Sequence, residues 1–564
     1  MEDNRVYNEY DRYLSPLDVW AIAFGCTIGW GAFIMPGTTF LPVAGPLGTV
    51  IAMAISVLIM LVIGANFSFL MRHNPGTGGV YAYTKSAFGR DHAFLCAWFL
   101  SLSYLTVLFM NATSLFLVIR MVFGRRLQYG YNYYNIAGNH IFMGEVGASI
   151  IALASVGLLF INAKPLLQKL QTILAAVLLA CVVIVAAACL PRLKLGSLQE
   201  SFGILGGSPA FGVFSIVMLA PWAFVGFEVI SLETAHFDFK VHRSRWIIIA
   251  TILLSGVVYV ALTLVGVCAR PDGYASWQAY IADLGKLDGI SAAPTFFSAK
   301  AIMGNVGLIV IAVAALAAIL TGMIAAYRAT TRVLSTMAED RILSDKFSNT
   351  TYSILFIMVV SILISIFGRN ALQCFMELTS LGAVIGFGYT SASAWKIARK
   401  TGDRRFVVLG AVGSIASVAF IIVQLIPKLT EMETMGADAF LLTTIWCLLG
   451  FLFYLRTVTR SGATANMGAS AAGIVLFALL LYSALMWMGK RLMASESVQD
   501  VRMTLRTEGS VMLVVVFIGL IVMMYIQRIT RRKYEAAKLQ RNAAAEPPSN
   551  PGDGDEVEKR DAEL

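Results

Sequence analysis

Long apolar segments recur along nearly the whole chain, and they limit what it can fold into more than any other feature. Each runs for about 17 to 25 residues, enough for a helix to cross a hydrocarbon layer about 30 Å thick. Of the 564 residues, 58% are hydrophobic and 13% are charged, an apolar excess that a water-soluble domain could not keep off its surface. The sequence therefore predicts an all-α integral membrane protein.

The hydropathy pattern predicts about 14 membrane-spanning helices. They are expected at residues 18–40, 44–70, 92–120, 144–161, 169–190, 208–236, 245–269, 300–334, 353–367, 372–395, 406–427, 438–456, 469–489 and 509–528. Lys and Arg gather in 240–245, 396–405 and 528–533, segments that lie inside if the N-terminus is cytoplasmic. We therefore expect a multi-pass protein of the plasma membrane or bacterial inner membrane, with both termini in the cytoplasm.

The segments outside the predicted spans have their own composition. Residues 271–293 are too polar to cross a membrane, so we expect an outward connection with a short amphipathic helix. The tail from Tyr534 onward is charged and poor in aromatic residues, which predicts disorder. The seven cysteines are scattered, mostly through apolar runs, and predict neither disulfides nor a metal site.

Two predicted spans carry residues that interrupt a helix. The first contains GCTIGWGAFIMPG at residues 25–37, where three glycines precede a proline. The sixth contains APWAFVGFEVISLETAHF at residues 220–237, with Pro221, Gly226 and then Glu228 inside an apolar stretch. Glycine lowers the cost of unwinding, and unwound backbone at this depth is tolerated only where it is buried in protein or lines a cavity. A carboxyl group there is costly and marks a functional site.

The positions of the two breaks predict a repeated architecture. They lie in the first and sixth spans, as in a five-plus-five inverted repeat, which holds its substrate near the midplane between half-helices. Free N–H groups after the first break suit a carboxylate and free carbonyls in the second suit an ammonium group, so together they would select a zwitterion. The alternative is that the glycines only let helices pack closely, in the small-xxx-small manner of Gly25 and Gly29.

Three further motifs follow in order with these two segments. They are NPGTGGVYAYTKSAFG at 74–89, TTRVLSTMAEDRIL at 330–343 and ELTSLGAVIGF at 377–387. Together the five segments resemble the amino acid-polyamine-organocation (APC) superfamily of permeases, over residues 15–460. The resemblance implies a LeuT-type fold with a five-plus-five inverted-repeat core.

On this basis the chain divides into four parts. They are a cytoplasmic segment at 1–17, a ten-helix core at 18–395 with repeats at 18–190 and 208–395, four peripheral helices at 406–528, and a disordered cytoplasmic tail at 529–564.

The resemblance also implies backbone recognition of the substrate at both breaks, with its carboxylate at the first and its amine at the second. Trp222 stands where some antiporters of the family carry a gating aromatic, so we expect it to cover the site from outside; the alternative is an indole packed against helices or lipid. Glu228 stands where members often carry an acid, and we expect it to exchange protons or couple gating to occupancy, the alternative being a protonated carboxyl that bridges helices. The predicted substrate-binding residues are Thr27, Ile28, Gly29, Trp30, Gly31, Ala223, Phe224, Val225, Tyr104 and Tyr327, with Trp222 as gate and Glu228 and Glu233 as proton or coupling residues.

The chain departs from the family pattern at several places. Trp30 stands between the paired glycines, where the family usually has a small residue, and is expected to crowd the carboxylate pocket. Leu178 stands where proton-coupled members carry a lysine, so a fixed internal cation is not expected there. Glu233 is an additional acid, for which we favour a place at the cytoplasmic mouth over contact with a cationic substrate.

Other polar side chains within the spans have two interpretations. Thr330 and Thr331 would supply hydroxyls to a sodium ion near the first break, although such groups more often bond back to their own helix. Tyr104, Asn111 and Tyr327 would line the site or serve as interhelical hydrogen-bond partners.

These observations predict a secondary active transporter (permease, symporter or exchanger) of amino acids or related amines, with neutral amino acids favoured over cationic ones. Its expected partners are that substrate and the lipid bilayer, with H⁺ or Na⁺ as a coupling ion and no cofactor. We recognise no nucleotide-binding, metal-ligand or nucleophile motif, so we expect neither an enzyme nor an ATP-driven pump. The basic residues are dispersed, so no nucleic-acid partner is expected. A solute-sensing receptor that does not transport is the alternative, and the oligomeric state is left open.

Overall fold

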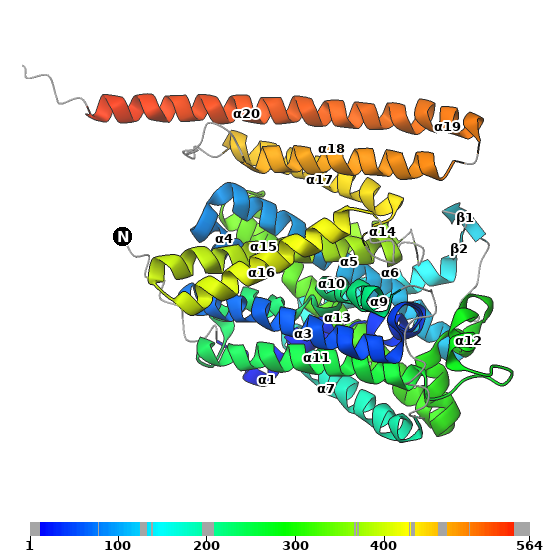
Figure 1. The fold of residues 1–564 in the computed structure, drawn as a ribbon. Coiled ribbons are helices and arrows are strands. Elements are labelled where there is room, and N and C mark those ends of the chain that lie inside the picture. Colours follow the sequence, from blue (N-terminus) through cyan, green and yellow to red (C-terminus); the bar gives the residue numbers. More distant parts are fainter. Residues whose placement is uncertain are drawn as a thin grey trace, which may run out of the picture.

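The computed structural model describes residues 12–76, 78–124, 132–136, 139–193, 208–365, 368, 372–427, 429, 435–460, 471–495 and 497–545. Nearly all of these residues lie in helices (Figure 1). The main helices are α1 (Pro16–Thr27), α2 (Gly31–Met35), η2 (Pro36–Phe40), α3 (Leu41–His73), α4 (Gly79–Phe88), α5 (Arg90–Phe123), α6 (Met143–Asn162), α7 (Lys164–Cys189), α9 (Pro209–Val217), α10 (Ala220–Phe224), η5 (Phe227–Leu232), α11 (Ser244–Gly266), α12 (Trp277–Ala282), α13 (Pro294–Glu339), α14 (Thr350–Ser365), α15 (Leu372–Thr401), α16 (Arg404–Leu425), α17 (Ala437–Arg460), α18 (Ala471–Met493), α19 (Val498–Thr504), η12 (Leu505–Gly509) and α20 (Ser510–Ala545).

Within these residues, ten helices are long and apolar enough to cross a membrane. They coincide with ten of the 14 predicted spans. The other four predicted spans correspond to α14, which is apolar but shorter, to α15, and to two spans that are each broken into short helices. The multi-pass architecture is therefore confirmed. The two broken spans differ from the other spans because neither is one continuous helix.

The centre of the molecule is formed by α5, which packs along α13 and along α15. Hydroxyl groups join α5 to α15: the Thr106 and Thr379 hydroxyl oxygens are 2.7 Å apart, and the Ser103 hydroxyl donates to the Thr379 carbonyl over 3.0 Å. On the flanks, α7 packs against α13 and α1, while α3 packs against α9 and α11. Both broken spans lie inside this assembly.

The helices after residue 404 attach to the centre in two ways. Helix α16 packs along α15 and α3, so it borders the central helices directly. Helices α17, α18 and α20 pack mainly on one another, and contacts with α5 and α15 attach this group to the rest (Figure 1). The predicted peripheral segment at 406–528 thus contains one helix in close contact with the centre and a separate group beyond it.

The structure corrects two expectations. A short antiparallel hairpin, β1 (Asn132–Ile136) and β2 (Asn139–Phe142), connects α5 to α6, so the chain is not entirely helical. Helix α20 continues to Ala545, so the predicted disorder of 529–564 is wrong for residues 529–545. Alanine, arginine and lysine are frequent in this stretch and favour a helix beyond the apolar run. Residues 546–564 lie outside the described residues, as do residues 1–11 of the predicted N-terminal segment.

Candidate functional site

The first broken span is interrupted at residues 28–30. Helix α1 ends at Thr27, Ile28 is extended (φ −96°, ψ 99°), and helix resumes at Gly31. The Ile28 N–H donates to the Phe24 carbonyl over 2.9 Å and closes α1. The next three N–H groups, at Gly29, Trp30 and Gly31, make no hydrogen bond with any residue that the structure describes. The free donors therefore begin one residue later than the predicted Ile28.

The second broken span is interrupted at residues 225–226. Helix α10 ends at Phe224, Val225 is extended in ψ (134°), and Gly226 has φ +124°, a conformation that L side chains disfavour. Among the described residues, none donates a hydrogen bond to the carbonyl oxygens of Ala223, Phe224 or Val225. The expected acceptors are thus present at this break.

The two breaks lie against each other. A Cβ atom placed on Gly226 would be 2.6 Å from the Cys26 carbonyl carbon and 2.6 Å from the Thr27 nitrogen. Only a glycine allows the two backbones to approach this closely, and its positive φ requires glycine a second time. The free N–H groups of one break and the free carbonyls of the other consequently belong to one buried region.

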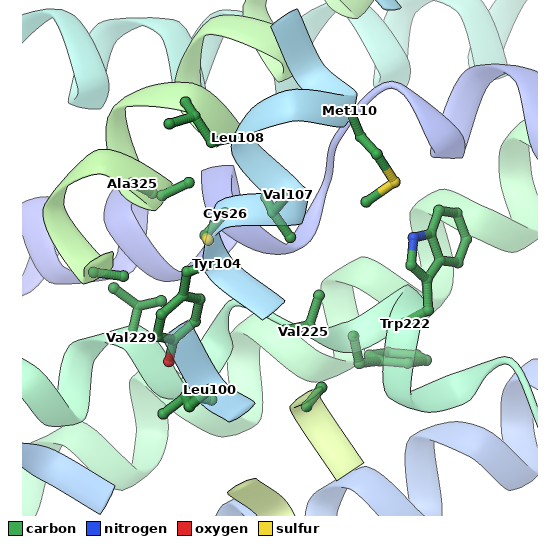
Figure 2. Close-up of a cluster of buried hydrophobic side chains, with 14 of the residues drawn as sticks. Cys26, Leu100, Tyr104, Val107, Leu108, Met110, Trp222, Val225, Val229 and Ala325 are labelled. Carbon is green, nitrogen blue, oxygen red and sulfur yellow. The ribbon is translucent and has the colours of Figure 1, made fainter. Parts of the chain in front are cut away.

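Trp222 lies directly over Gly31. A Cβ atom on Gly31 would overlap the Trp222 indole, with its Cζ2 atom 2.6 Å away. The Trp30 and Trp222 rings meet edge to face with centroids 6.5 Å apart, and both side chains are buried. Figure 2 shows Trp222 beside Met110 of α5, displaced along that helix from Tyr104. The two indoles cover one end of the first break.

Glu228 is fully buried immediately after the second break. The Gly226 N–H donates to its Oε2 atom over 2.8 Å, so the carboxyl group also braces the break. The Tyr104 hydroxyl lies next to this carboxyl group without meeting hydrogen-bond geometry. Glu228 Oε1 and the Tyr104 hydroxyl have no hydrogen-bond partner among the described residues, which is unusual for buried polar atoms. In Figure 2, Tyr104 lies close to Cys26 and Val229, beside both broken spans.

Two further polar residues adjoin the first break. A Cβ atom on Gly29 would be 3.1 Å from Asn111 Oδ1, and the Asn111 amide also touches Gly322 of α13. Asn111 Oδ1 has no hydrogen-bond partner among the described residues, whereas its Nδ2 donates to the Val107 carbonyl. Thr321 of α13 lies against Gly25. The structure thus places Asn111 beside the first break, together with Thr321, which the sequence did not indicate.

Tyr327 and Thr330 lie apart from this cluster and make the hydrogen bonds of the alternative interpretation. The Tyr327 hydroxyl donates to the Leu153 carbonyl of α6 over 3.0 Å, so Tyr327 ties α13 to α6 rather than lining the breaks. The Thr330 hydroxyl donates to the Ala326 carbonyl of its own helix. The α13 hydroxyl beside α1 at Gly25 is that of Thr321, about three turns of helix before Thr331.

Glu233 lies at the far end of the second broken span, in an ion pair. Its two carboxylate oxygens accept from Arg332 Nε and Nη2 over 3.0 and 3.2 Å, and His236 Nδ1 lies 3.2 Å from Oε2. Beside this ion pair, the Leu14 N–H donates to the His236 carbonyl over 3.0 Å. These contacts join the segment before α1, the end of the second broken span and α13 at one edge of the bundle.

Comparison with known proteins relates this geometry to a family. A family model described as "Amino acid permease" matches residues 14–448. The "Methylthioribose transporter" of Bacillus subtilis (strain 168) is 32% identical over 103 residues, 18% of this chain and 22% of that protein. The "Branched-chain amino acid permease BcaP" of the same organism is 22% identical over 268 residues, 45% of this chain and 54% of that protein. The chain thus spans about half the length of one of these relatives and less of the other.

Proposed function

Because the chain belongs to the amino acid permease family of the APC superfamily, we propose that it is a secondary active transporter of amino acids or related amines. The contact between the two breaks at Gly226 carries this proposal. It brings free N–H groups and free carbonyls together in a buried region, where they would recognise a carboxylate and an ammonium group. The proposed fold is the LeuT-type five-plus-five repeat with 14 spans, with both termini in the cytoplasm of a plasma or bacterial inner membrane.

A neutral substrate fits the side chains around the breaks better than a cationic one. Cys26, Val225 and Val229 are apolar side chains of this region (Figure 2), and the Glu228 carboxyl group beside them already accepts from the Gly226 N–H. Glu233, the acid that a cationic side chain could use, is engaged by Arg332. One relative is named for branched-chain amino acids, whose side chains are uncharged, which supports the same proposal.

Alternating access would use the contacts at the two ends of the site. On one side, Trp222 and Trp30 close over Gly31; on the other, the Glu233–Arg332 pair joins the second broken span to α13. Opening either end requires one of these contacts to separate while the other holds. Glu228 lies between them on the broken span, where it would link proton exchange or occupancy to that movement.

Counterflow in proteoliposomes tests the transport proposal. Liposomes loaded with one unlabelled amino acid or amine are exposed to its labelled form, across pH and with or without Na⁺. We expect saturable counterflow with a neutral amino acid at least about tenfold faster than with a cationic one, because burying an unpaired charge costs more than 1.4 kcal/mol. Ligand binding without counterflow of any compound in the panel would identify a receptor instead.

The Glu228→Gln variant tests the coupling role in the same assay. A glutamine keeps a side-chain oxygen for the Gly226 N–H but cannot release a proton. We expect binding to survive and the pH dependence of transport to flatten. Transport with an unchanged pH dependence would show that Glu228 only braces the break.

A further inference from the structure

A crevice of about 810 Å³ opens on the outside of the bundle, away from the two breaks. Helices α11 and α16 both pack on α3, which lies between them and forms the floor (Figure 1). Asn66 fixes one wall, because its amide donates to the Leu409 carbonyl of α16 over 3.1 Å. Gly64 of α3 allows α11, the other wall, to pack closely against α3, since a Cβ at Gly64 would be 2.7 Å from Ile248 Cγ2 of α11. Its volume falls in the range of about 300–1,000 Å³ typical of sites for small molecules.

The crevice has an apolar length and a basic mouth. Its length is lined by aliphatic side chains such as Leu58, Leu61 and Leu409. Its mouth carries Arg72 at the end of α3, Arg245 at the start of α11 and Arg405 at the start of α16, so all three lie on one membrane face. Asp403 also lines the mouth, which leaves two net positive charges.

The three arginines are held in place without a carboxylate partner. The Arg72 and Arg405 guanidinium groups lie 5.8 and 5.9 Å from the centre of the same Phe406 ring, and Arg245 lies 4.9 Å from Trp246. None of the three forms an ion pair with a residue that the structure describes. Arg72 Nε donates to the Ser68 carbonyl over 3.3 Å. The planar donors that a guanidinium group keeps when it lies over an aromatic ring match the oxygens of a phosphate.

From this arrangement, we propose that the crevice binds an anionic glycerophospholipid, with its phosphate on Arg72, Arg245 and Arg405 and an acyl chain along α3. A basic pocket between helices on one membrane face is suited to an anionic headgroup, and the aliphatic floor is suited to the chain. Asp403 caps α16 by accepting from the Phe406 N–H over 3.4 Å, and it lies within reach of hydroxyl groups on a glycerol headgroup.

A second crevice shows what the basic mouth adds. It measures about 570 Å³ and is lined by aliphatic residues of α7 and α11, such as Val182, Leu254 and Val257, with no charged side chain in its lining. Such a surface accepts the chains of any lipid. It therefore serves as an internal control for selectivity.

Native mass spectrometry of the full chain in detergent tests the proposal. The protein is titrated with phosphatidylglycerol, phosphatidylethanolamine or phosphatidylcholine of identical chains. We expect a retained phosphatidylglycerol. In the triple variant Arg72→Gln, Arg245→Gln, Arg405→Gln its affinity should fall by at least about tenfold, since each basic residue near an anionic lipid contributes roughly fivefold.

The matched control removes the same charge elsewhere. Lys240→Gln, Arg399→Gln and Lys400→Gln neutralise three exposed basic residues outside the crevice lining. An equal loss of phosphatidylglycerol in this control would overturn the proposal in favour of a diffuse basic surface. Equal retention of the three lipids by the unaltered protein would overturn it as well.

Two further measurements separate the lipid from a free phosphate. Glycerol 1-phosphate at millimolar concentration should not displace the lipid; if it binds as well as the lipid does, the crevice is an anion site and the lipid proposal fails. Leu61→Trp keeps every charge but fills the crevice, and should weaken lipid retention, whereas Val257→Trp in the second crevice should not. Equal effects of these two substitutions would also count against the proposal.

Discussion

Helices α5 and α20 are both apolar enough to cross a membrane, yet they differ completely in what surrounds them. The most apolar stretch of α5 has a mean hydropathy of 2.0 and is entirely buried in protein, whereas that of α20 has a mean hydropathy of 2.7 and is 22% buried. In water, the more apolar helix would be the more buried one. In a bilayer the lipid is as apolar as the protein interior, so hydropathy does not distinguish the two.

Polar side chains do distinguish them. Along α5, Ser103, Thr106 and Asn111 are buried, and each donates a hydrogen bond to a carbonyl: Ser103 to one of α15, Thr106 and Asn111 to carbonyls of α5 itself. On α20, side chains such as Leu513 and Phe517 are exposed on the surface of the bundle. A polar group in a membrane needs a protein partner, so these groups mark the helix that lies beside the breaks.

The strongest test of this comparison is Gly226→Ala at the contact of the breaks. The new Cβ would be 2.6 Å from the α1 backbone, and φ +124° is strained for alanine. Because displacing a site by about 1 Å costs about 100-fold in rate, we expect counterflow to fall by about two orders of magnitude. Gly273→Ala is the control, since Gly273 also has positive φ (+98°) but no neighbouring atom within 4 Å. If both variants lose activity equally, the close approach of the breaks is not what matters.

An ion pair on the second broken span and one on the peripheral helices should differ in the same way. Arg332 pairs with the buried Glu233, while Arg491 pairs with Glu508 over 2.7 Å on the peripheral helices, where both side chains are partly exposed. We expect Arg332→Gln to lower the free energy of unfolding by about 2 kcal/mol, because it leaves a buried carboxylate unpaired. Arg491→Gln should cost about 0.5 kcal/mol.

Reversible denaturation in detergent, followed by circular dichroism, measures both changes. Adding Glu233→Gln to Arg332→Gln should recover part of the loss, because it removes the unpaired charge. The absence of any recovery would show that Arg332 acts through packing and not through its charge.

The closure of Trp222 over Gly31 gives a smaller expected effect. In Gly31→Ala the Cβ meets the indole, and overpacking of this kind costs about 1–3 kcal/mol, so we expect about tenfold slower counterflow. Trp222→Ala combined with Gly31→Ala should restore part of the rate by freeing the space. Gly147→Ala in α6, where a Cβ meets nothing within 4 Å, is the control. A double variant no faster than Gly31→Ala would remove Trp222 from the gate.

The breaks could be predicted from the sequence because their causes are local. Clustered glycines, a proline and a buried acid at Glu228 identify a helix that cannot continue, wherever its neighbours lie. The extended backbone at Ile28 and the positive φ at Gly226 follow from these residues. The contact between the two breaks is not local, and only the structure shows that Gly226 meets Cys26.

The sequence does not predict in this way which neighbouring helix a given side chain of an unbroken helix contacts. Thr321 and Tyr327 lie six positions apart, about 120° around the helix axis, so one can meet α1 while the other meets α6. Because α13 is apolar or small on most sides and is buried by several helices, its sequence does not show which side meets α1. Asn111 gave a usable signal, since an amide within an apolar run is costly unless it has a function or a partner.

The finest test compares the same substitution on α5 and on α20. Val107 of α5 is 4% exposed and Val514 of α20 is 57% exposed. Truncation to alanine removes the same atoms from both, and lipid replaces the lost contacts only at Val514, so the energetic difference reports packing rather than transfer from water. We expect Val107→Ala to lower the free energy of unfolding by about 1 kcal/mol and Val514→Ala by less than about 0.5 kcal/mol. Equal losses in reversible denaturation would mean that α20 is covered by protein in the membrane, for instance by a second copy of the chain. The difference in burial between α5 and α20 would then hold only for a single copy of the chain.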